Sequence, residues 1–201
     1  MKLFKLNIIE MQKTAAITIT RAGALELLKA YTENKNLIKH GLAVEAAMRH
    51  YAGVFGEDEE MWGIVGLLHD FDYEKFPSSK EHPYKGQEIL REAGYPNVVR
   101  QAIMAHAPHT GTPRNTKLEK AIFAVDELTG FIVAVALVRP SKKIKDVDVP
   151  AVKKKLKEKP FAAGVNREYI KIGADELGLS LDEHIKHVLT AMQGIAKELG
   201  L

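Results

Sequence analysis

Residues 66–72 read Gly66-Leu67-Leu68-His69-Asp70-Phe71-Asp72, and the rest of the chain can be organised around this stretch. A histidine followed directly by an aspartate closes an apolar run that begins at Met61. Ionisable side chains are rarely buried in such a run without a partner. A metal ion would serve as that partner, so the His69-Asp70 doublet is a candidate metal site.

The doublet falls at the C-terminal end of a predicted helix. Asp58-Glu59-Glu60 supplies the negative charge that favours a helix N-terminus, and apolar residues follow as far as Leu68. Adjacent residues on a helix diverge by about 100°. His69 and Asp70 can therefore share an ion only near a helix end, where the backbone can adjust, and their position meets that requirement.

The composition is that of an ordinary globular protein and limits the ligands available to a metal. The chain has 201 residues, enough for one compact domain, with 46% hydrophobic and 27% charged residues. Its formal net charge of +3 is too small to indicate a global field for binding nucleic acid. Because there is no cysteine, disulfides and thiolate sites are excluded, and His, Asp and Glu remain as ligands.

No targeting or membrane segment is predicted. The basic, partly apolar start is broken by Lys5, Asn7 and Glu10, so we expect a cytoplasmic protein, with either Met1 or Met11 as the true start. The stretch 121–138 is nearly all apolar, but Asp126 and Glu127 lie inside it. A buried central helix is therefore expected rather than a membrane span.

Helical periodicity runs through most of the chain and predicts an all-α fold with no strand. The expected helices are 21–32, one starting near 36 and ending before 56, 58–68, 82–94, 97–105, a long one capped by Thr116, 150–158, 166–177 and 182–199. Residues 71–81 are predicted to form a loop beside the doublet. We expect an N-terminal arm (1–20), a metal-binding helical domain (21–140) and a C-terminal helical extension (141–201) packed on the same domain.

Two further inward residues complete a ligand set. His40 shares a helical face with Gly41, Val44 and Tyr51, and Asp126 lies in the buried long helix. With His69-Asp70 they offer two imidazoles and two carboxylates, enough for one divalent ion. Imidazole suits Zn, Mn, Fe, Co and Ni, while carboxylates favour the harder ions, so Mn or Fe fits at least as well as Zn.

The order H…HD…D on helices resembles the HD-domain superfamily of all-helical, metal-dependent phosphohydrolases. The similarity covers roughly residues 35–135. It implies that His40, His69, Asp70 and Asp126 form a metal site.

A second segment extends the resemblance. Residues 82–90, His82-Pro83-Tyr84-Lys85-Gly86-Gln87-Glu88-Ile89-Leu90, are similar to the HPxxGxxIL segment of HDIG-type members, and 98–106 resembles their next helix. This implies a second ion held by His82 and His106, with Asp70 as the bridge. His-Asp-Phe-Asp replaces His-Asp-Ile-Gly, and the Gly-Tyr-Pro signature of the cyclic-dinucleotide phosphodiesterases is missing. Cyclic di-GMP is therefore not the expected substrate.

The resemblance implies hydrolysis of a phosphorylated small molecule or nucleotide, as a monoester or diester, with one or two divalent ions activating water. Asp70 and Asp72 are the predicted catalytic residues, with Asp72 as an acid or base or merely a cap at the helix end. The candidate substrate contacts are His109, Lys75, Arg139, Lys142 and Arg167.

Two alternatives remain open at this point. A few proteins of this fold use a di-iron centre on the same ligands as an oxygenase. A non-catalytic module that binds nucleic acid or another ligand through Lys142 to Lys159 is the other alternative. Few aromatic residues lie between those lysines to stack on bases, so nucleic acid is not the expected partner.

Overall fold

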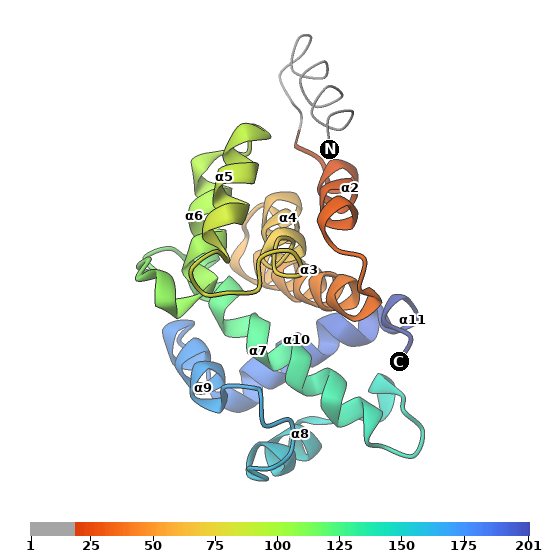
Figure 1. Cartoon of the computed structure of the whole chain (residues 1–201). Coiled ribbons are helices and arrows are strands. Elements are labelled where there is room, and N and C mark those ends of the chain that lie inside the picture. Colours follow the sequence, from red (N-terminus) through yellow and green to blue (C-terminus); the bar gives the residue numbers. More distant parts are fainter. Residues whose placement is uncertain (1–18) are drawn as a thin grey trace.

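A computed structural model describes residues 19–201, and this part of the chain is helical without any β-strand (Figure 1). The predicted all-α fold class is therefore confirmed. The α-helices are α2 (Arg21–Tyr31), α3 (Lys35–Phe55), α4 (Glu59–Leu68), α5 (Tyr84–Glu92), α6 (Asn97–His106), α7 (Lys117–Leu137), α8 (Val149–Leu156), α9 (Arg167–Glu176), α10 (Leu181–Gly194) and α11 (Ala196–Leu199). The predicted arm (1–20) and the choice of start lie almost wholly outside the described residues.

Side-chain caps fix where the helices begin. Thr20 accepts a hydrogen bond from the Gly23 amide ahead of α2. Thr116 and Glu119 form a capping box at α7, and Ser180 and Glu183 form another at α10. Each box satisfies backbone donors that a helix N-terminus leaves unpaired.

One predicted helix is divided in the structure. The single helix expected over 182–199 is in fact α10 and α11, separated by Ile195, whose φ of −118° and ψ of 26° are not helical. Gly194 precedes the break, and glycine is a poor helix former because it has more backbone freedom to lose.

Helices α3 and α4 approach each other at backbone distance. A Cβ on Gly41 would lie 3.1 Å from the Leu67 carbonyl oxygen, and one on Gly66 would lie 2.8 Å from the Val44 carbonyl oxygen. Larger residues at these positions would push the helices apart. This close packing holds His40 beside the C-terminal end of α4.

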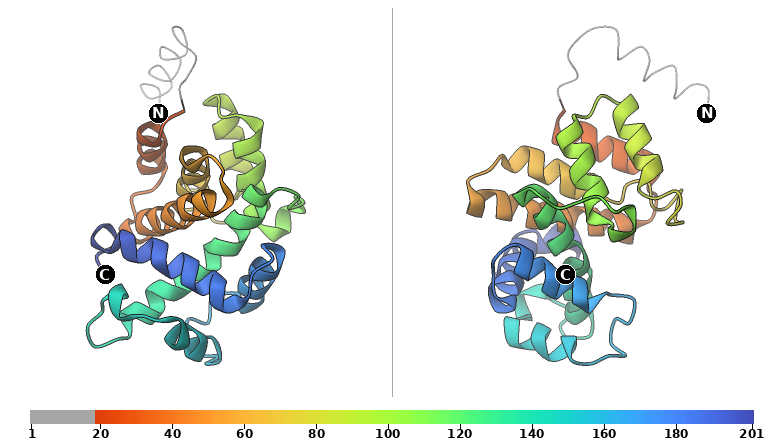
Figure 2. Two further views of the ribbon diagram at one scale, coloured as in Figure 1. Left: turned by 180° about the vertical axis from the view of Figure 1, so that it is seen from behind. Right: turned by 90° about the vertical axis from the view of Figure 1, so that its left-hand side faces the viewer.

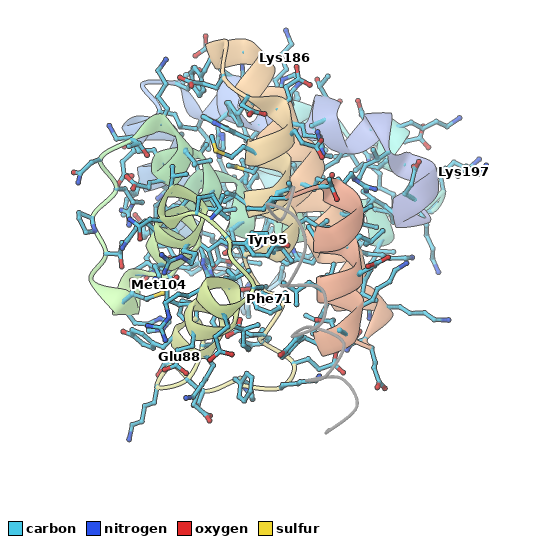
Figure 3. The ribbon with its side chains drawn as sticks, turned by 90° about the horizontal axis from the view of Figure 1, so that it is seen from above. Phe71, Glu88, Tyr95, Met104, Lys186 and Lys197 are labelled. Carbon is cyan, nitrogen blue, oxygen red and sulfur yellow. The ribbon has the colours of Figure 1, made fainter. Side chains whose placement is uncertain are left out.

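The other helices surround this pair (Figures 1 and 2). Helices α5 and α6 lie together on one side of α4 and α2 on the other, while α7 crosses below. Helices α8 and α9 pack on the far side of α7, and α10 packs on both α3 and α7. In the view from above, Phe71 lies in the interior, whereas Lys186 and Lys197 lie at the rim of the molecule (Figure 3).

One hydrophobic core joins all of these helices. It runs from Leu28 on α2 through Phe131 on α7 to Met192 and Leu199 near the C-terminus. The core is therefore continuous across residue 140, and the division of the chain there stays a prediction. Within residues 19–201, no helix has the length and hydropathy needed to cross a membrane.

A buried ionic network ties α2, α3 and α4 together. Glu45 is 4% exposed, and its carboxylate accepts from the Arg21 guanidinium at 2.6 Å and from Arg49 at 3.0 Å. Arg49 also donates to Glu60 at 2.8 Å. A buried carboxylate needs such partners because its desolvation is costly.

His184 joins three helices inside the core. Its Nδ1 accepts a 2.6 Å hydrogen bond from the Tyr51 hydroxyl on α3, and its Nε2 donates to the Ala124 carbonyl on α7 at 2.9 Å. The side chain is fully buried. Burial disfavours the imidazolium and lowers the pKa of His184 to about 4.

This histidine should make the protein acid-sensitive. The pKa is about 4 when folded and about 6.5 when unfolded. The neutral His184 ring therefore contributes its full stabilisation of the folded state above pH 6.5. This contribution is lost as the pH falls toward 4, which lowers the free energy of unfolding by roughly 3 kcal/mol. Urea unfolding at several pH values should show a shallower dependence in His184→Gln between pH 6.5 and 4. Equal slopes in the two proteins would contradict the assignment.

Candidate metal centre

Two groups of possible metal ligands converge between α3, α4, α6 and α7. The first contains His40 on α3, His69 at the C-cap of α4, Asp70 and Asp126 on α7. The second contains Asp70 again, together with His82 before α5 and His106 at the end of α6. In each group, one ligand atom from every residue lies within 4.8 Å of the others. The structure therefore brings together all six residues predicted as metal ligands.

The atoms of the first group are spaced as ligands of one ion would be. His40 Nε2 lies 3.2 Å from His69 Nε2 and 3.0 Å from Asp126 Oδ1. The Asp70 Oδ2 atom is 3.5 Å from His69 Nε2 and 3.9 Å from His40 Nε2. Tetrahedral ligands about 2.0–2.2 Å from a common ion lie about 3.3–3.6 Å apart, so this donor set fits a divalent metal.

The second group uses the other oxygen of the same carboxylate. Asp70 Oδ1 lies 3.2 Å from His82 Nε2 and 3.3 Å from His106 Nε2, and those two nitrogens are 3.3 Å apart. Asp70 therefore presents one oxygen to each group.

Two of the histidines are oriented by the same local device. The Nδ1 of His69 donates to the Gly66 carbonyl at 2.8 Å, and the Nδ1 of His106 donates to the Ile103 carbonyl. In both cases the acceptor lies three residues earlier, at a helix end where carbonyls lack an intrahelical partner. The hydrogen bond fixes the tautomer and turns Nε2 toward the candidate metal position.

His82 is oriented by Asp72. Its Nδ1 donates to Asp72 Oδ1 at 2.8 Å, and Asp72 Oδ2 accepts from the Gly86 amide, also at 2.8 Å. A Cβ on Gly86 would lie 2.8 Å from the Asp72 carboxyl carbon, so this approach requires glycine. Asp72 is fully buried and does not line the adjoining cavity. The geometry indicates a positioning role through His82, and the predicted role as an acid, a base or a cap at the helix end stays a prediction.

Charge balance within the cluster shifts its proton affinities. Burial opposes ionisation of Asp70, but the charge of His69 and the hydrogen bonds from His106, His69 and His82 outweigh it, so the pKa of Asp70 is held well below its usual range. Burial likewise disfavours the charged form of His82, yet Asp70 and Asp72 raise the pKa of His82 to about 9. The carboxylates of Asp70 and Asp72 thus favour a positive charge on the histidine between them.

The turn after α4 is held against the α2–α3 connection. Thr32 donates to the Phe71 carbonyl at 3.0 Å, and Glu74 accepts from the backbone amides of residues 33 and 34. Lys75 donates to the Ala30 carbonyl at 2.7 Å and lies over the Tyr31 ring. Lys75, predicted as a substrate contact, is therefore occupied in fixing this turn.

The other predicted cations are not brought to the centre either. The Arg167 guanidinium donates to backbone carbonyls of residues 156–165, including Leu156 at 3.2 Å and Val165 at 3.1 Å. Arg139 lies 3.9 Å from Asp148, and Lys142 is exposed with a positive φ of 52°. None of these cations lines the cavity beside the cluster, so their assignment as substrate contacts stays a prediction that the geometry does not support.

That cavity has a volume of about 200 Å³ and adjoins both ligand groups. Its lining is His82, His106, Ala107, Pro108, His109, Phe123, Asp126, Glu127 and Tyr169. His109 donates from Nε2 to the His82 carbonyl at 2.9 Å and lies at the cavity, which is compatible with its predicted role as a substrate contact.

Sequence reasoning missed five of these lining residues, namely Ala107, Pro108, Phe123, Glu127 and Tyr169. Glu127 was visible as the second acidic residue within an apolar helix, beside Asp126, and could have been found by that signal. Burial and the neighbouring Asp126 raise the pKa of Glu127. The position of Phe123 and Tyr169 at the cavity could not be predicted from the sequence, because their contact depends on how α9 packs against α7.

Comparison with known proteins agrees with this geometry. Residues 37–130 match the family model described as the HD domain. This segment contains all six candidate ligands, and the match supports membership of the HD-domain superfamily. No curated protein and no solved structure matches the chain at a significant level. The family is that of a metal-dependent, hydrolase-like fold, and the His/Asp cluster could hold a divalent metal.

The positioning role of Asp72 is open to a direct test. In Asp72→Asn the side chain keeps its size but offers a single oxygen acceptor to two donors, His82 Nδ1 and the Gly86 amide. Loss of such an orienting contact typically costs 10- to 100-fold in metal affinity. Competition with a chromophoric chelator should show weaker Mn or Zn binding while circular dichroism stays unchanged. Unaltered affinity would contradict the role.

Proposed function

We propose that the protein is a metal-dependent phosphohydrolase that acts on a phosphate ester of a small molecule or nucleotide. The observation that carries the proposal is the position of Asp70, whose two oxygens face separate histidine pairs at 3.2–3.9 Å. One carboxylate shared in this way suits a pair of divalent ions, and its negative charge offsets part of theirs. Mn, Fe, Co, Ni and Zn are all compatible with imidazole and carboxylate ligands.

In this proposal, bound ions supply Lewis acidity toward water and toward the phosphoryl oxygens. The chain contributes the fixed orientation of the imidazoles of His69, His82 and His106, an apolar core on one side and an open cavity on the other. Hydrolysis forms a bond from phosphorus to the oxygen of water, breaks the bond from phosphorus to the leaving oxygen, and transfers a proton to that oxygen. The cavity lined by Phe123 and Tyr169 is where the leaving group would lie.

Replacement of Asp70 gives the sharpest test. Asp70→Ala should lose metal binding and hydrolysis together, more completely than loss of any single histidine, because no other described carboxylate faces both groups. The assay uses protein stripped with chelator, reloaded with Mn, Co, Ni, Zn or Fe, and tested on a panel of phosphate esters. Asp175→Ala, which removes an exposed carboxylate on α9, is the matched control. Full metal content and turnover in Asp70→Ala would refute the proposal.

The number of ions can be tested separately. If two ions are bound, His82→Ala or His106→Ala should lower the metal content toward one ion per chain and leave the helical fold intact, since both rings belong to the second group alone. Metal analysis by mass spectrometry after dialysis gives the stoichiometry. An unchanged ratio would mean that the two histidines are substrate contacts or structural groups.

The same measurements separate hydrolysis from the alternative di-iron oxygenase. A hydrolase should turn over phosphate esters with at least one colourless ion such as Mn or Zn. Two irons per chain with visible absorption bands, and no phosphate release with any ion, would favour the oxygenase.

A further inference from the structure

The cavity beside the metal centre is built by the docking of α9 on α7. A Cβ on Gly173 would lie 2.5 Å from Ala124 Cα, so the two helices touch at a glycine that no other residue could replace without movement. Tyr169 is one helical turn before Gly173, and Phe123 directly precedes Ala124. The contact therefore places an aromatic ring from each helix at the cavity.

The two rings form an apolar wall. Their centroids are 5.4 Å apart with an interplanar angle of 51°. Arg114 lies over Phe123 with its guanidinium carbon 3.8 Å from the centroid, and it binds Glu176 at 2.7 and 2.5 Å. Arg114 does not line the cavity, and its charge is already balanced by Glu176.

Glu127 adds a carboxylate to the same cavity. One of its oxygens accepts from the Asn166 backbone amide at 3.2 Å, and among the described residues no lysine or arginine lines the cavity. The space of about 200 Å³ is smaller than the 300–1,000 Å³ of a typical site for a drug-sized ligand. The cavity thus offers a hydrogen-bond acceptor and an apolar face, and no lysine or arginine among its lining residues acts as a counter-ion to a second anionic group.

From these features we propose that this cavity selects the leaving group of the substrate. The group is small and uncharged or cationic, it carries a hydroxyl or amino donor for Glu127, and its apolar side lies on Phe123 and Tyr169. A leaving group with a carboxylate or a second phosphate is rejected because it meets Glu127 without a neutralising partner. This inference rests on the proposed function, which puts the phosphoryl group at the metal ligands.

Binding of non-hydrolysable phosphonates tests the selection. The matched probes are 3-hydroxypropylphosphonate and 3-phosphonopropionate, which have similar length and differ in bearing a hydroxyl or a carboxylate. Calorimetry with Mn-loaded protein at pH 8 should show that the hydroxyl compound binds at least about 30-fold more tightly, as expected for a like-charge contact in a partly buried site. Butylphosphonate, which lacks the donor, should bind about 5- to 10-fold more weakly than the hydroxyl compound.

The variant Glu127→Gln separates charge from packing. Its amide oxygen can still accept from the Asn166 amide, so the fold should persist, but the preference for hydroxyl over carboxylate should fall below about 5-fold. Glu168→Gln removes the same charge from an exposed position on α9 that does not line the cavity, and it should keep the wild-type preference. The same ratio should appear in kcat/KM for glycerol 3-phosphate against 3-phosphoglycerate.

The possible failures are distinguishable. Equal binding of the hydroxyl and carboxylate probes to the wild type, or an unchanged preference in Glu127→Gln, would overturn the selection while leaving the phosphohydrolase proposal intact. Absence of any phosphonate binding together with absence of phosphate release would overturn both.

Discussion

The arrangement of the candidate metal centre depends on one carboxylate surrounded by four imidazoles. Asp70 can remain ionised at the edge of a core only because positive charge or hydrogen-bond donors face both of its oxygens. Each ring must in turn be held by its second nitrogen, since a ring that is free to rotate leaves the carboxylate without a partner. Helix ends at His69 and His106 supply the carbonyls that do this, and Asp72 does it for His82. The termination of α4 and α6 at these histidines is thus part of the site itself.

Close helix packing determines which side chains can meet. Glycines at the α3–α4 and α7–α9 contacts let backbones approach, and the first contact aligns the ligands while the second closes the cavity. Asp126 and Glu127 are adjacent in sequence but have different contacts, because adjacent helical side chains diverge by about 100°. Asp126 lies 3.0 Å from His40 Nε2, whereas Glu127 accepts from the Asn166 amide. One turn of α7 therefore contributes both to the cluster and to the cavity wall.

Much of this arrangement was predictable from the sequence, and the failures have physical causes. Periodicity and caps predicted the helices. The ligands were predictable because each is a polar residue within or at the end of an apolar helical pattern. The partners of Lys75 and Arg167 were not predictable, since backbone carbonyls accept from them and a carbonyl leaves no trace in the sequence. The contact between His50 Nε2 and His187 Nδ1 on α10, at 2.9 Å, was not predictable either, because only tertiary packing creates it.

The distribution of charge constrains how an anionic substrate could be held. Residues 139–159 contain nine basic and three acidic side chains, a net charge of +6, whereas the whole chain carries +3. The remainder, which includes the metal centre, is therefore net negative by three charges. Exposed charges more than about 10 Å apart are largely screened at 0.1 M salt, so the basic segment can help a phosphate at the centre only if it lies nearby. Among residues 19–201 no lysine or arginine lines the cavity, and attraction of a phosphoryl group must come from the imidazole and metal positions themselves. A centre organised in this way favours a substrate with one compact anionic group over one whose charge is spread along its length.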